Sequence, residues 1–284
     1  MKTILKTLIA ALVLFVGYNL FLRYAHPVPG PGQQQWQKNT ILMQDYVDYH
    51  QGDPVVIVGT SLSARLYNSI LPKGYYNLSL AGGSIYEGLS VIMHTPKKPK
   101  YLFIESNIFY KYLDKDAIAN VFDPFSEKLR KTIPSFREEN QPANLITPLL
   151  SKTPKNPNTG PSTADADIRN MLLKERIKEY QTVPANDDMT INLKLLKSYI
   201  NGLQSQGIKV VLYEIPMNCA LYATPRYAVP KKIITDALPA SEYKWMEKAD
   251  CAAYQYADGS HMELGSAGDF VKWFVGEATI EMAK

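Results

Sequence analysis

Two short segments near opposite ends of the chain contain the side chains that could carry nucleophilic chemistry. The first reads Gly59-Thr60-Ser61 and the second reads Asp258-Gly259-Ser260-His261. A serine hydroxyl becomes a nucleophile when a base accepts its proton, and that base needs an acceptor that fixes its tautomer. Asp and His three residues apart in a loop can supply both. The two segments therefore predict acyl transfer through Ser61, with His261 as general base and Asp258 as its orienting partner.

Each segment also has a simpler interpretation. Serine and threonine are frequent helix N-caps, so Thr60, Ser61 or Ser63 has that alternative role. An isolated Asp-x-x-His is equally compatible with a capping Asp beside an exposed His. The position of the Asp258/His261 pair supports the catalytic interpretation, because the pair lies near the end of the α/β body and the Gly-Thr-Ser segment lies near its start.

Two further loops supply groups that can stabilise an oxyanion. Asn77–Ser84 follows the second predicted strand and contains Gly82, and Asn107 follows the third. A glycine N–H and an Asn amide at the sheet edge beside Ser61 would complete an oxyanion hole with the N–H of Ser61 itself. Gly82 is preferred to Gly83 because it comes first after the strand. Taken singly, each loop shows only ordinary turn residues.

The elements that must position these residues are short apolar runs that alternate with helix-compatible stretches. Continuous apolar runs are typical of strands buried on both faces, and their alternation with helices indicates a parallel sheet. We therefore predict an α/β fold, a three-layer parallel sheet with helices on both faces, and Ser61 at the positive end of a helix. The predicted strands are Pro54–Val58, Tyr75–Leu80, Lys100–Glu105 and Ile208–Ile215, and the predicted helices are Trp36–His50, Ser61–Ser69, Ile85–His94, Ile191–Ser205 and Glu263–Ala283.

A long segment separates the third predicted strand from the fourth. It runs from Tyr110 to about Met189 and contains one convincing helical pattern, Ala166–Tyr180. A structureless loop of that length is uncommon inside a compact domain. We predict a helical insertion at about 110–189 that covers the carboxyl edge of the sheet, where α/β folds bind ligands.

The N-terminal region is apolar and nearly free of charge. Ile4–Leu22 reaches the length of about 20 residues that a spanning helix needs if Lys6 snorkels to the interface. A cleaved signal peptide is the alternative, but cleavage after Ala25 would place Arg23 two residues earlier, a poor fit to the usual small-residue site. The prediction is a transmembrane signal anchor at 4–22, a Pro/Gly/Gln-rich tether at 26–35 and an α/β domain at 36–284 outside the cytoplasm.

The composition excludes several classes of protein. The 284 residues include 31 Lys+Arg and 27 Asp+Glu, a near balance that argues against a nucleic-acid-binding protein. An apolar fraction of 46% is far from the composition of disordered chains. Two cysteines exclude a disulfide-dense scaffold and a four-cysteine zinc site. Cys219 and Cys251 either form a bridge in an oxidising compartment or are two small buried residues. No metal or cofactor is expected.

The candidate residues occur in a characteristic order along the chain. Ser61, Gly82, Asn107 and the Asp258/His261 pair follow one another at successive strand ends, and in this order the sequence resembles the SGNH hydrolases, also called the GDSL-like superfamily. The first block, normally Gly-Asp-Ser, has Thr60 in the middle; the third, normally Gly-x-Asn-Asp, keeps only the Asn; the last is intact. The resemblance covers about residues 53–275 apart from the insertion, and it implies an SGNH/flavodoxin-like fold with a Ser-His-Asp triad.

With its N-terminal helix, the chain looks like the polymer-modifying branch of that superfamily. Members of this branch serve teichoic-acid D-alanylation and alginate O-acetylation together with an acyl-exporting membrane partner. The resemblance implies an extracytoplasmic O-acyltransferase that acts on a cell-surface or secreted polysaccharide. An acetylesterase would use the same residues, and the altered third block leaves open a catalytically inactive SGNH-fold binding or assembly protein. Gly59 and the Ala81-Gly82-Gly83 loop also suggest a nucleotide-binding domain, although the Gly-x-x-x-x-Gly-Lys pattern is missing.

Overall fold

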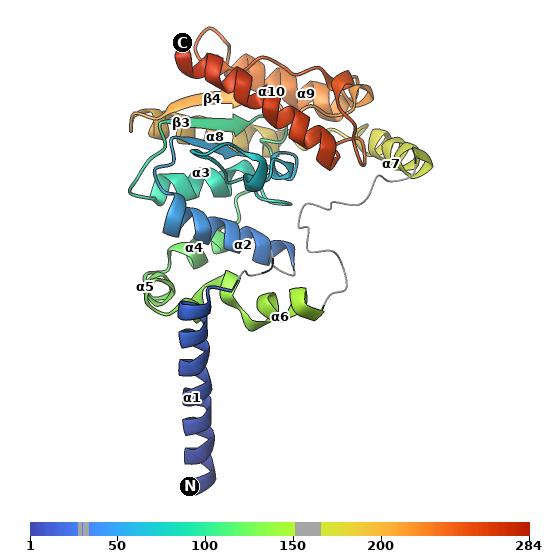
Figure 1. The fold of residues 1–284 in the computed structure, drawn as a ribbon. Coiled ribbons are helices and arrows are strands. Elements are labelled where there is room, and N and C mark those ends of the chain that lie inside the picture. The colour runs from blue at the N-terminus through green and yellow to red at the C-terminus, as the bar shows by residue number, and fades with distance from the viewer. Residues whose placement is uncertain (28–29, 31–33, 151–165) are drawn as a thin grey trace. The chain divides into compact units, whose positions relative to one another are not determined.

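The structure is a computed structural model that describes residues 1–27, 30, 34–150 and 166–284 (Figure 1). The chain divides into two compact units, which we describe separately. The first comprises Met1–Asp48 and Asp116–Pro157, and the second comprises Tyr49–Lys115 and Asn158–Lys284. The predicted insertion at about 110–189 therefore contributes to both units. Half of the predicted tether, residues 28–29 and 31–33, lies outside the described residues.

The described part of the second unit is built on a five-stranded sheet in the order β2-β1-β3-β4-β5, with every neighbouring pair parallel. The prediction of an α/β fold with a parallel sheet is confirmed. The order reverses at β1, whose neighbours are β2 and β3, and doubly wound folds bind ligands at the carboxyl ends of such strands. The strands are β1 (Val55–Val58), β2 (Tyr75–Asn77), β3 (Tyr101–Glu105), β4 (Lys209–Tyr213) and β5 (Lys244–Trp245).

Helices flank this sheet, and Figure 1 shows α3 on one side of it and α10 on the other. The helix α8 packs against α3 and β4, and α9 packs beside α8. A capping box between Ser84 and Glu87 starts α3 directly after the loop that carries Gly82. The helices are α3 (Ile85–His94), α7 (Ala166–Glu179), α8 (Asn186–Gln204), α9 (Pro225–Ala237) and α10 (Leu264–Ala283).

An aromatic cluster joins the sheet to α10. The ring of Phe274 lies 5.2 Å from that of Phe103 on β3 and 5.1 Å from that of Tyr213 on β4. These rings are buried together with Phe270, and each buried aromatic side chain contributes on the order of 2–3 kcal/mol. The cluster therefore holds α10 against β3 and β4.

The predicted helix Ser61–Ser69 is wrong. Two short 3-10 turns, η2 (Ser63–Arg65) and η3 (Asn68–Ile70), occupy this segment instead. The Asn77 side chain donates to the carbonyl oxygens of Ser63 and Leu66 at 2.7 and 2.8 Å, and a helix needs those oxygens for its own hydrogen bonds. Ser61 is consequently not placed at the positive end of a helix, and another group must position it.

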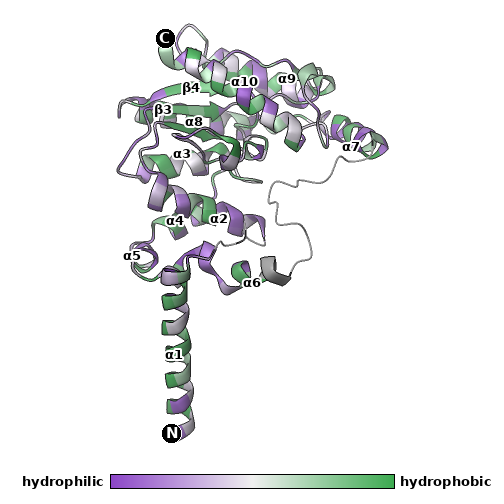
Figure 2. Ribbon diagram, viewed as in Figure 1, coloured by the Kyte–Doolittle hydropathy of each residue, from purple (hydrophilic) through white to green (hydrophobic). Residues whose placement is uncertain are grey.

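The first unit contains the N-terminal helix α1 (Lys2–Ala25), which is long and apolar enough to cross a membrane. Figure 2 shows hydrophobic residues along most of its length. By length and composition α1 fits either an anchor or a signal sequence. The other elements are α2 (Gln35–Asp45), a π-helical turn η1 (Tyr46–His50), α4 (Lys115–Phe122), α5 (Pro124–Thr132), the 3-10 turns η4 (Pro134–Phe136) and η5 (Glu138–Asn140), and α6 (Pro142–Leu150).

The last turns of α1 are part of the folded first unit. Leu22 is buried, and the Tyr18 hydroxyl donates to the carbonyl oxygen of Asn140. A signal peptide that is removed makes no lasting contacts with the mature chain, so we expect α1 to be retained. Intact mass measurement of the protein purified from membranes should show a chain that includes residues 1–25. A mass that corresponds to cleavage after Ala25 would contradict this.

Candidate active site

Ser61, His261 and Asp258 lie within hydrogen-bonding distance of one another. The Nε2 atom of His261 is 3.0 Å from the Oγ of Ser61, and its Nδ1 is 2.8 Å from the Oδ2 of Asp258. A carboxylate accepts and does not donate, so Nδ1 carries the ring proton and Nε2 is left to accept the serine proton. The His261 side chain is 21% exposed, which leaves the pair accessible to a substrate. The structure thus brings the three predicted catalytic residues together.

Asp258 is held in place by its own loop. Its Oδ1 accepts the N–H groups of Ser260 and His261 at 2.9 and 2.8 Å. Gly259, between Asp258 and Ser260, has a φ of 86°, a conformation that favours glycine. Burial would raise the pKa of Asp258, but the hydrogen bonds and charge of His261 and the N–H of Ser260 outweigh it and hold this pKa well below its usual range. Asp258 therefore stays ionised beside His261.

A buried carboxylate, Glu105 at the end of β3, fixes the loop that carries Ser61. Glu105 accepts hydrogen bonds from the N–H and hydroxyl of Thr60, both at 2.8 Å, and from the N–H and hydroxyl of Ser63 at 3.3 and 2.6 Å. Thr60 and Ser63 flank Ser61, so Glu105 holds the nucleophile loop on both sides. In the sequence, Glu105 stands out only as the residue that begins the altered third block. An acidic residue at the end of a fully apolar strand is the signal that could have revealed it.

Gly59 and Tyr213 complete this buried network. A Cβ at Gly59 would lie 2.6 Å from the Oε2 of Glu105 and closer still to the Oγ of Ser63, so any side chain there would displace them. The Tyr213 hydroxyl lies 2.6 Å from the same Oγ and donates to it, because Ser63 donates its own proton to Glu105. Burial and the charge of Glu105 raise the pKa of Tyr213 well above its usual value, which keeps the phenol protonated.

The groups predicted to hold an oxyanion follow β1, β2 and β3, which are neighbours in the sheet. Among the described residues, neither the N–H of Ser61 nor that of Gly82 donates to another protein group. Gly82 has a φ of 72° in the turn before α3. The Asn107 side chain accepts the N–H of Ile215 at 2.8 Å and donates to its carbonyl oxygen at 2.9 Å, which leaves one amide N–H for another acceptor. The oxyanion hole stays a prediction.

Arg176 on α7 contacts the triad, although it belongs to none of the motifs in the sequence. Its Nη2 donates to the Oδ2 of Asp258 at 2.8 Å, the same oxygen that faces His261. Arg169 on the same helix pairs with Glu263 at 2.8 Å. Two arginines seven residues apart lie on one face of a helix, and this spacing is the signal that could have indicated an acidic neighbour. Two ion pairs thus join α7 to the loop that carries His261.

Replacing Arg176 with Met is expected to slow the reaction at Ser61. The substitution removes the donor that lies 2.8 Å from the Oδ2 of Asp258, the same oxygen that orients His261, so kcat for an ester substrate should fall by roughly three- to tenfold. Arg169→Met is the matched control, because it breaks an ion pair of the same helix that does not include Asp258. Equal kcat values for the two variants would contradict the prediction.

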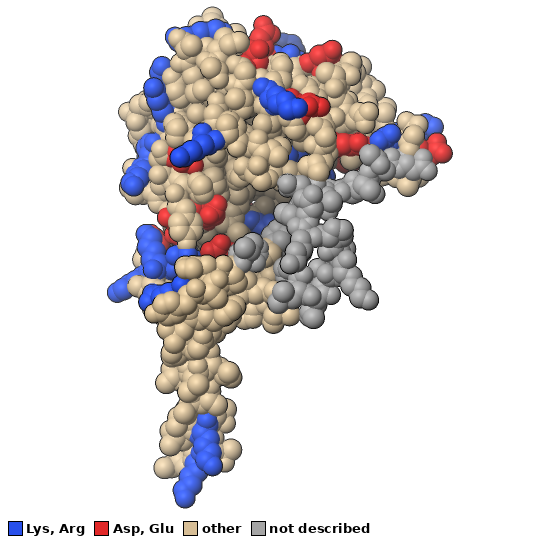
Figure 3. Space-filling view, viewed as in Figure 1, with Lys and Arg blue, Asp and Glu red and all other residues tan. Residues whose placement is uncertain are grey.

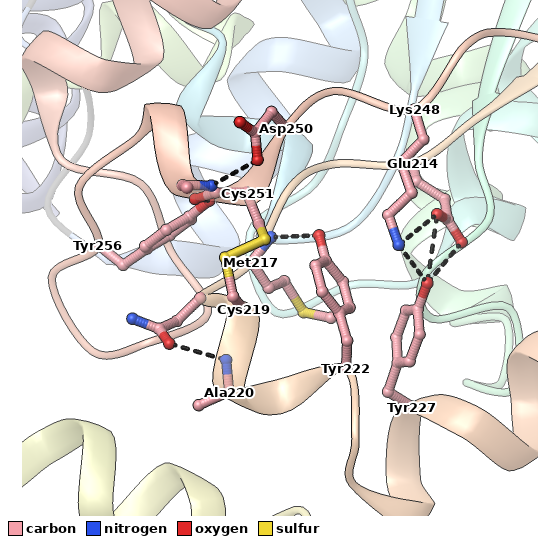
Figure 4. The surroundings of a disulfide bond; sticks show 12 residues. Glu214, Met217, Cys219, Ala220, Tyr222, Tyr227, Lys248, Asp250, Cys251 and Tyr256 are labelled. Carbon is pink, nitrogen blue, oxygen red and sulfur yellow. Dashed lines mark hydrogen bonds and ion pairs between the residues drawn. A yellow bond between two sulfur atoms is a disulfide. The ribbon is translucent and has the colours of Figure 1, made fainter.

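Cys219 and Cys251 form a disulfide, and Figure 4 shows it between the labelled side chains of Tyr256 and Tyr222. Asn218, directly before Cys219, donates its N–H to the carbonyl oxygen of Gly259 at 2.8 Å. The disulfide therefore stabilises a segment that is hydrogen-bonded to the Asp258–His261 loop.

Removing this disulfide is expected to destabilise the second unit. The two cysteines are 32 residues apart, and a cross-link over a loop of this size contributes roughly 3.5–4 kcal/mol. Cys219→Ser with Cys251→Ser should lower the free energy of urea unfolding by that amount. Reductant should increase the mass of the denatured wild-type chain by two hydrogen atoms. An unchanged mass, or equal unfolding free energies, would contradict the prediction.

The sequence matches no protein-family model, no curated protein and no solved structure. Among the described residues, no group of three or more His, Cys, Asp or Glu side chains is arranged to hold a metal ion. The geometry around Ser61 is therefore the feature of the chain that points to a function.

Proposed function

We propose that the chain is a membrane-anchored serine acyl enzyme of the SGNH type that transfers acetyl-type groups to a polysaccharide outside the cytoplasm. The observation that carries the proposal is the chain of hydrogen bonds from Ser61 through His261 to Asp258. It occurs at the carboxyl edge of a parallel sheet next to the position where the strand order reverses. A three-layer SGNH arrangement agrees with the helices on both sides of the sheet.

The first half of the reaction acylates the serine. Ser61 Oγ attacks the acyl carbon of the donor while His261 Nε2 takes the serine proton, and His261 then gives that proton to the leaving group. The ionised Asp258 keeps the proton on Nδ1 and stabilises the imidazolium that forms. The N–H groups of Ser61 and Gly82 and the remaining amide N–H of Asn107 stabilise the oxyanion of each tetrahedral intermediate.

The second half of the reaction decides between a transferase and an esterase. In transfer, a sugar hydroxyl gives its proton to His261 and attacks the acyl carbon; the bond to the Ser61 Oγ then breaks, and His261 returns the proton to that oxygen. In hydrolysis, water takes the place of the sugar hydroxyl. The proposal of transfer rests on the resemblance and on α1, which would place the site close to a membrane partner that exports the acyl group. The disulfide agrees with an oxidising compartment outside the cytoplasm.

Reaction of the full-length protein with a fluorophosphonate probe tests the proposal. Mass spectrometry should locate the adduct on Ser61, and Ser61→Ala should abolish labelling. A transferase should then release acid from an ester donor more slowly as an oligosaccharide acceptor is added, with the acyl group recovered on the sugar. Release that is indifferent to the acceptor would identify an esterase. No labelling of a folded protein would favour an inactive binding or assembly protein.

A further inference from the structure

A turn of the first unit lies directly against α1. The ring of Phe136, in η4, is 6.3 Å from that of Phe15, centre to centre. The N–H of Ser135 donates to the Oδ1 of Asn19 at 3.0 Å. The turn Ile133–Phe136 thus contacts the second half of α1 through both apolar and polar groups.

The length of α1 determines how deep this contact would lie in a membrane. Its uncharged stretch, Thr7–Leu22, ends at Arg23 and is about 24 Å long at 1.5 Å per residue. The hydrocarbon core of a bilayer is roughly 30 Å thick, so this uncharged stretch has no residues to spare. Phe15 lies about 12 Å from Arg23 on the same scale. If α1 left the membrane at Phe15, the remaining Thr7–Leu14, about 12 Å long, could not cross it.

We propose that the turn Ile133–Phe136 inserts among the acyl chains of the bilayer leaflet on the Arg23 side of α1. A helix α1 that spans the membrane carries Phe15 below the headgroups, and the turn bound to Phe15 goes with it. This inference depends on α1 being a membrane span and is independent of the chemistry at Ser61.

The N–H groups of the turn are suited to a medium without water. Lipid offers no hydrogen-bond partners, so a peptide N–H within it must be paired inside the protein. Pro134 has no N–H, and every other N–H from Ile133 to Arg137 is paired. The pairs are Ile133 N–H to Leu129 O, Ser135 N–H to Asn19 Oδ1, Phe136 N–H to Ile133 O and Arg137 N–H to Pro134 O. The α1 residue Asn19, a polar side chain in the span, provides one of the acceptors.

The exposed side chains of the first unit also fit contact with lipid. Phe136 is 44% exposed although it stands beside another aromatic ring, and Phe125 at the start of α5 is 70% exposed. Aromatic residues are enriched where a protein meets the membrane interface. Figure 3 shows basic side chains gathered at the level of α5, which contributes Lys128 and Lys131. Such side chains are favourable next to anionic headgroups.

Fluorescence quenching on the full-length protein in nanodiscs of phosphatidylcholine and phosphatidylglycerol tests the proposal. The chain has two cysteines, joined to each other, so Phe136→Cys can be labelled selectively with an environment-sensitive fluorophore. The control is Lys272→Cys on α10, where the side chain is 80% exposed. We expect lipids with a spin label on the acyl chain to quench the fluorophore at 136 and to leave that at 272 bright. Iodide in the buffer should do the reverse.

Equal access of iodide to both positions would overturn the proposal. If the turn is instead covered by a second protein in the cell, it would be exposed to the buffer in these nanodiscs, which contain only this chain. Iodide would then reach both positions equally. Should Phe136→Cys fail to show the wild-type unfolding transition, Phe136→Trp replaces it, with brominated lipids as quencher and the wild-type emission subtracted. An intact mass that lacks residues 1–25 would remove the span on which the inference depends.

Discussion

His261→Ala and Ser61→Ala are each expected to lower kcat for p-nitrophenyl acetate by roughly four to six orders of magnitude. Without the imidazole nothing takes the proton from the Ser61 Oγ, which lies 3.0 Å from Nε2 in the structure. Without the hydroxyl there is no nucleophile. Because serine and base act as a unit, the double variant should be no slower than either single variant. The measurement is steady-state release of p-nitrophenol by the full-length protein.

The control for this prediction is His94→Ala. His94 ends α3 and bonds the carbonyl oxygen of Ser90 within its own helix, so its loss should leave the rate within about twofold. All variants should keep the wild-type unfolding midpoint within a few degrees. Turnover that persists in Ser61→Ala would contradict the assignment of the nucleophile.

The second large effect is expected at Glu105, on stability as well as on rate. Glu105→Ala leaves the buried N–H groups of Thr60 and Ser63 without their acceptor. Each unsatisfied group costs roughly 1–3 kcal/mol, and the cavity adds to this, so we expect a loss of about 3–6 kcal/mol in the free energy of unfolding. The fraction that still folds should turn over roughly a hundredfold more slowly, because the loop around Ser61 loses its support.

Two comparison variants separate a positioning role of Glu105 from a purely structural one. Glu105→Gln keeps an acceptor for the two N–H groups and should cost less than about 1 kcal/mol. Glu214→Ala removes another buried carboxylate, one that pairs with Lys231 at 2.7 Å and with Lys248 at 3.7 Å. It should lower stability and leave kcat within about threefold. If Glu214→Ala reduces kcat as much as Glu105→Ala does, Glu105 has no special role in positioning Ser61.

The Glu105→Gln variant should also differ from the wild type in how its stability depends on pH. Burial raises the pKa of Glu105, and the hydrogen bonds from Ser63 and Thr60 lower it only part of the way. The folded protein therefore holds this proton more tightly than the unfolded chain. The resulting stability is fully present below the unfolded pKa of about 4.3 and is lost as the pH rises through the folded pKa. Urea unfolding between about pH 4 and pH 8 should show the wild type losing stability relative to Glu105→Gln.

The sequence is informative where local pattern decides the structure. Continuous apolar runs predict β1, β3 and β4 because strands buried on both faces need them. The Asp-x-x-His spacing predicts a pair that a single loop can hold. By contrast, β5 is Lys244–Trp245, two residues that are too short to show a pattern.

Contacts between distant parts of the chain are not visible in local pattern. The helix expected after Ser61 is replaced by 3-10 turns because Asn77, on the next strand, takes the carbonyl oxygens the helix would use. In the same way, Glu105 contacts the loop that carries Ser61, and Arg176 contacts Asp258 of the triad. Only the topology of the fold brings these side chains close to the site. Helical periodicity locates α7, but nothing in its sequence shows which loop it faces.

The connectivity of the first unit has a consequence for how the protein is made. This unit combines residues 1–48 with residues 116–157, and part of the second unit is encoded between them. During synthesis the first segment emerges long before the residues that Tyr18 and Asn19 contact, and it must wait for them. The helix α1 therefore spends this interval without its partners, as a substrate for the insertion machinery rather than as part of a fold. A truncated chain that starts after α1 would leave the segment around Ser135 and Asn140 permanently in that unpartnered condition.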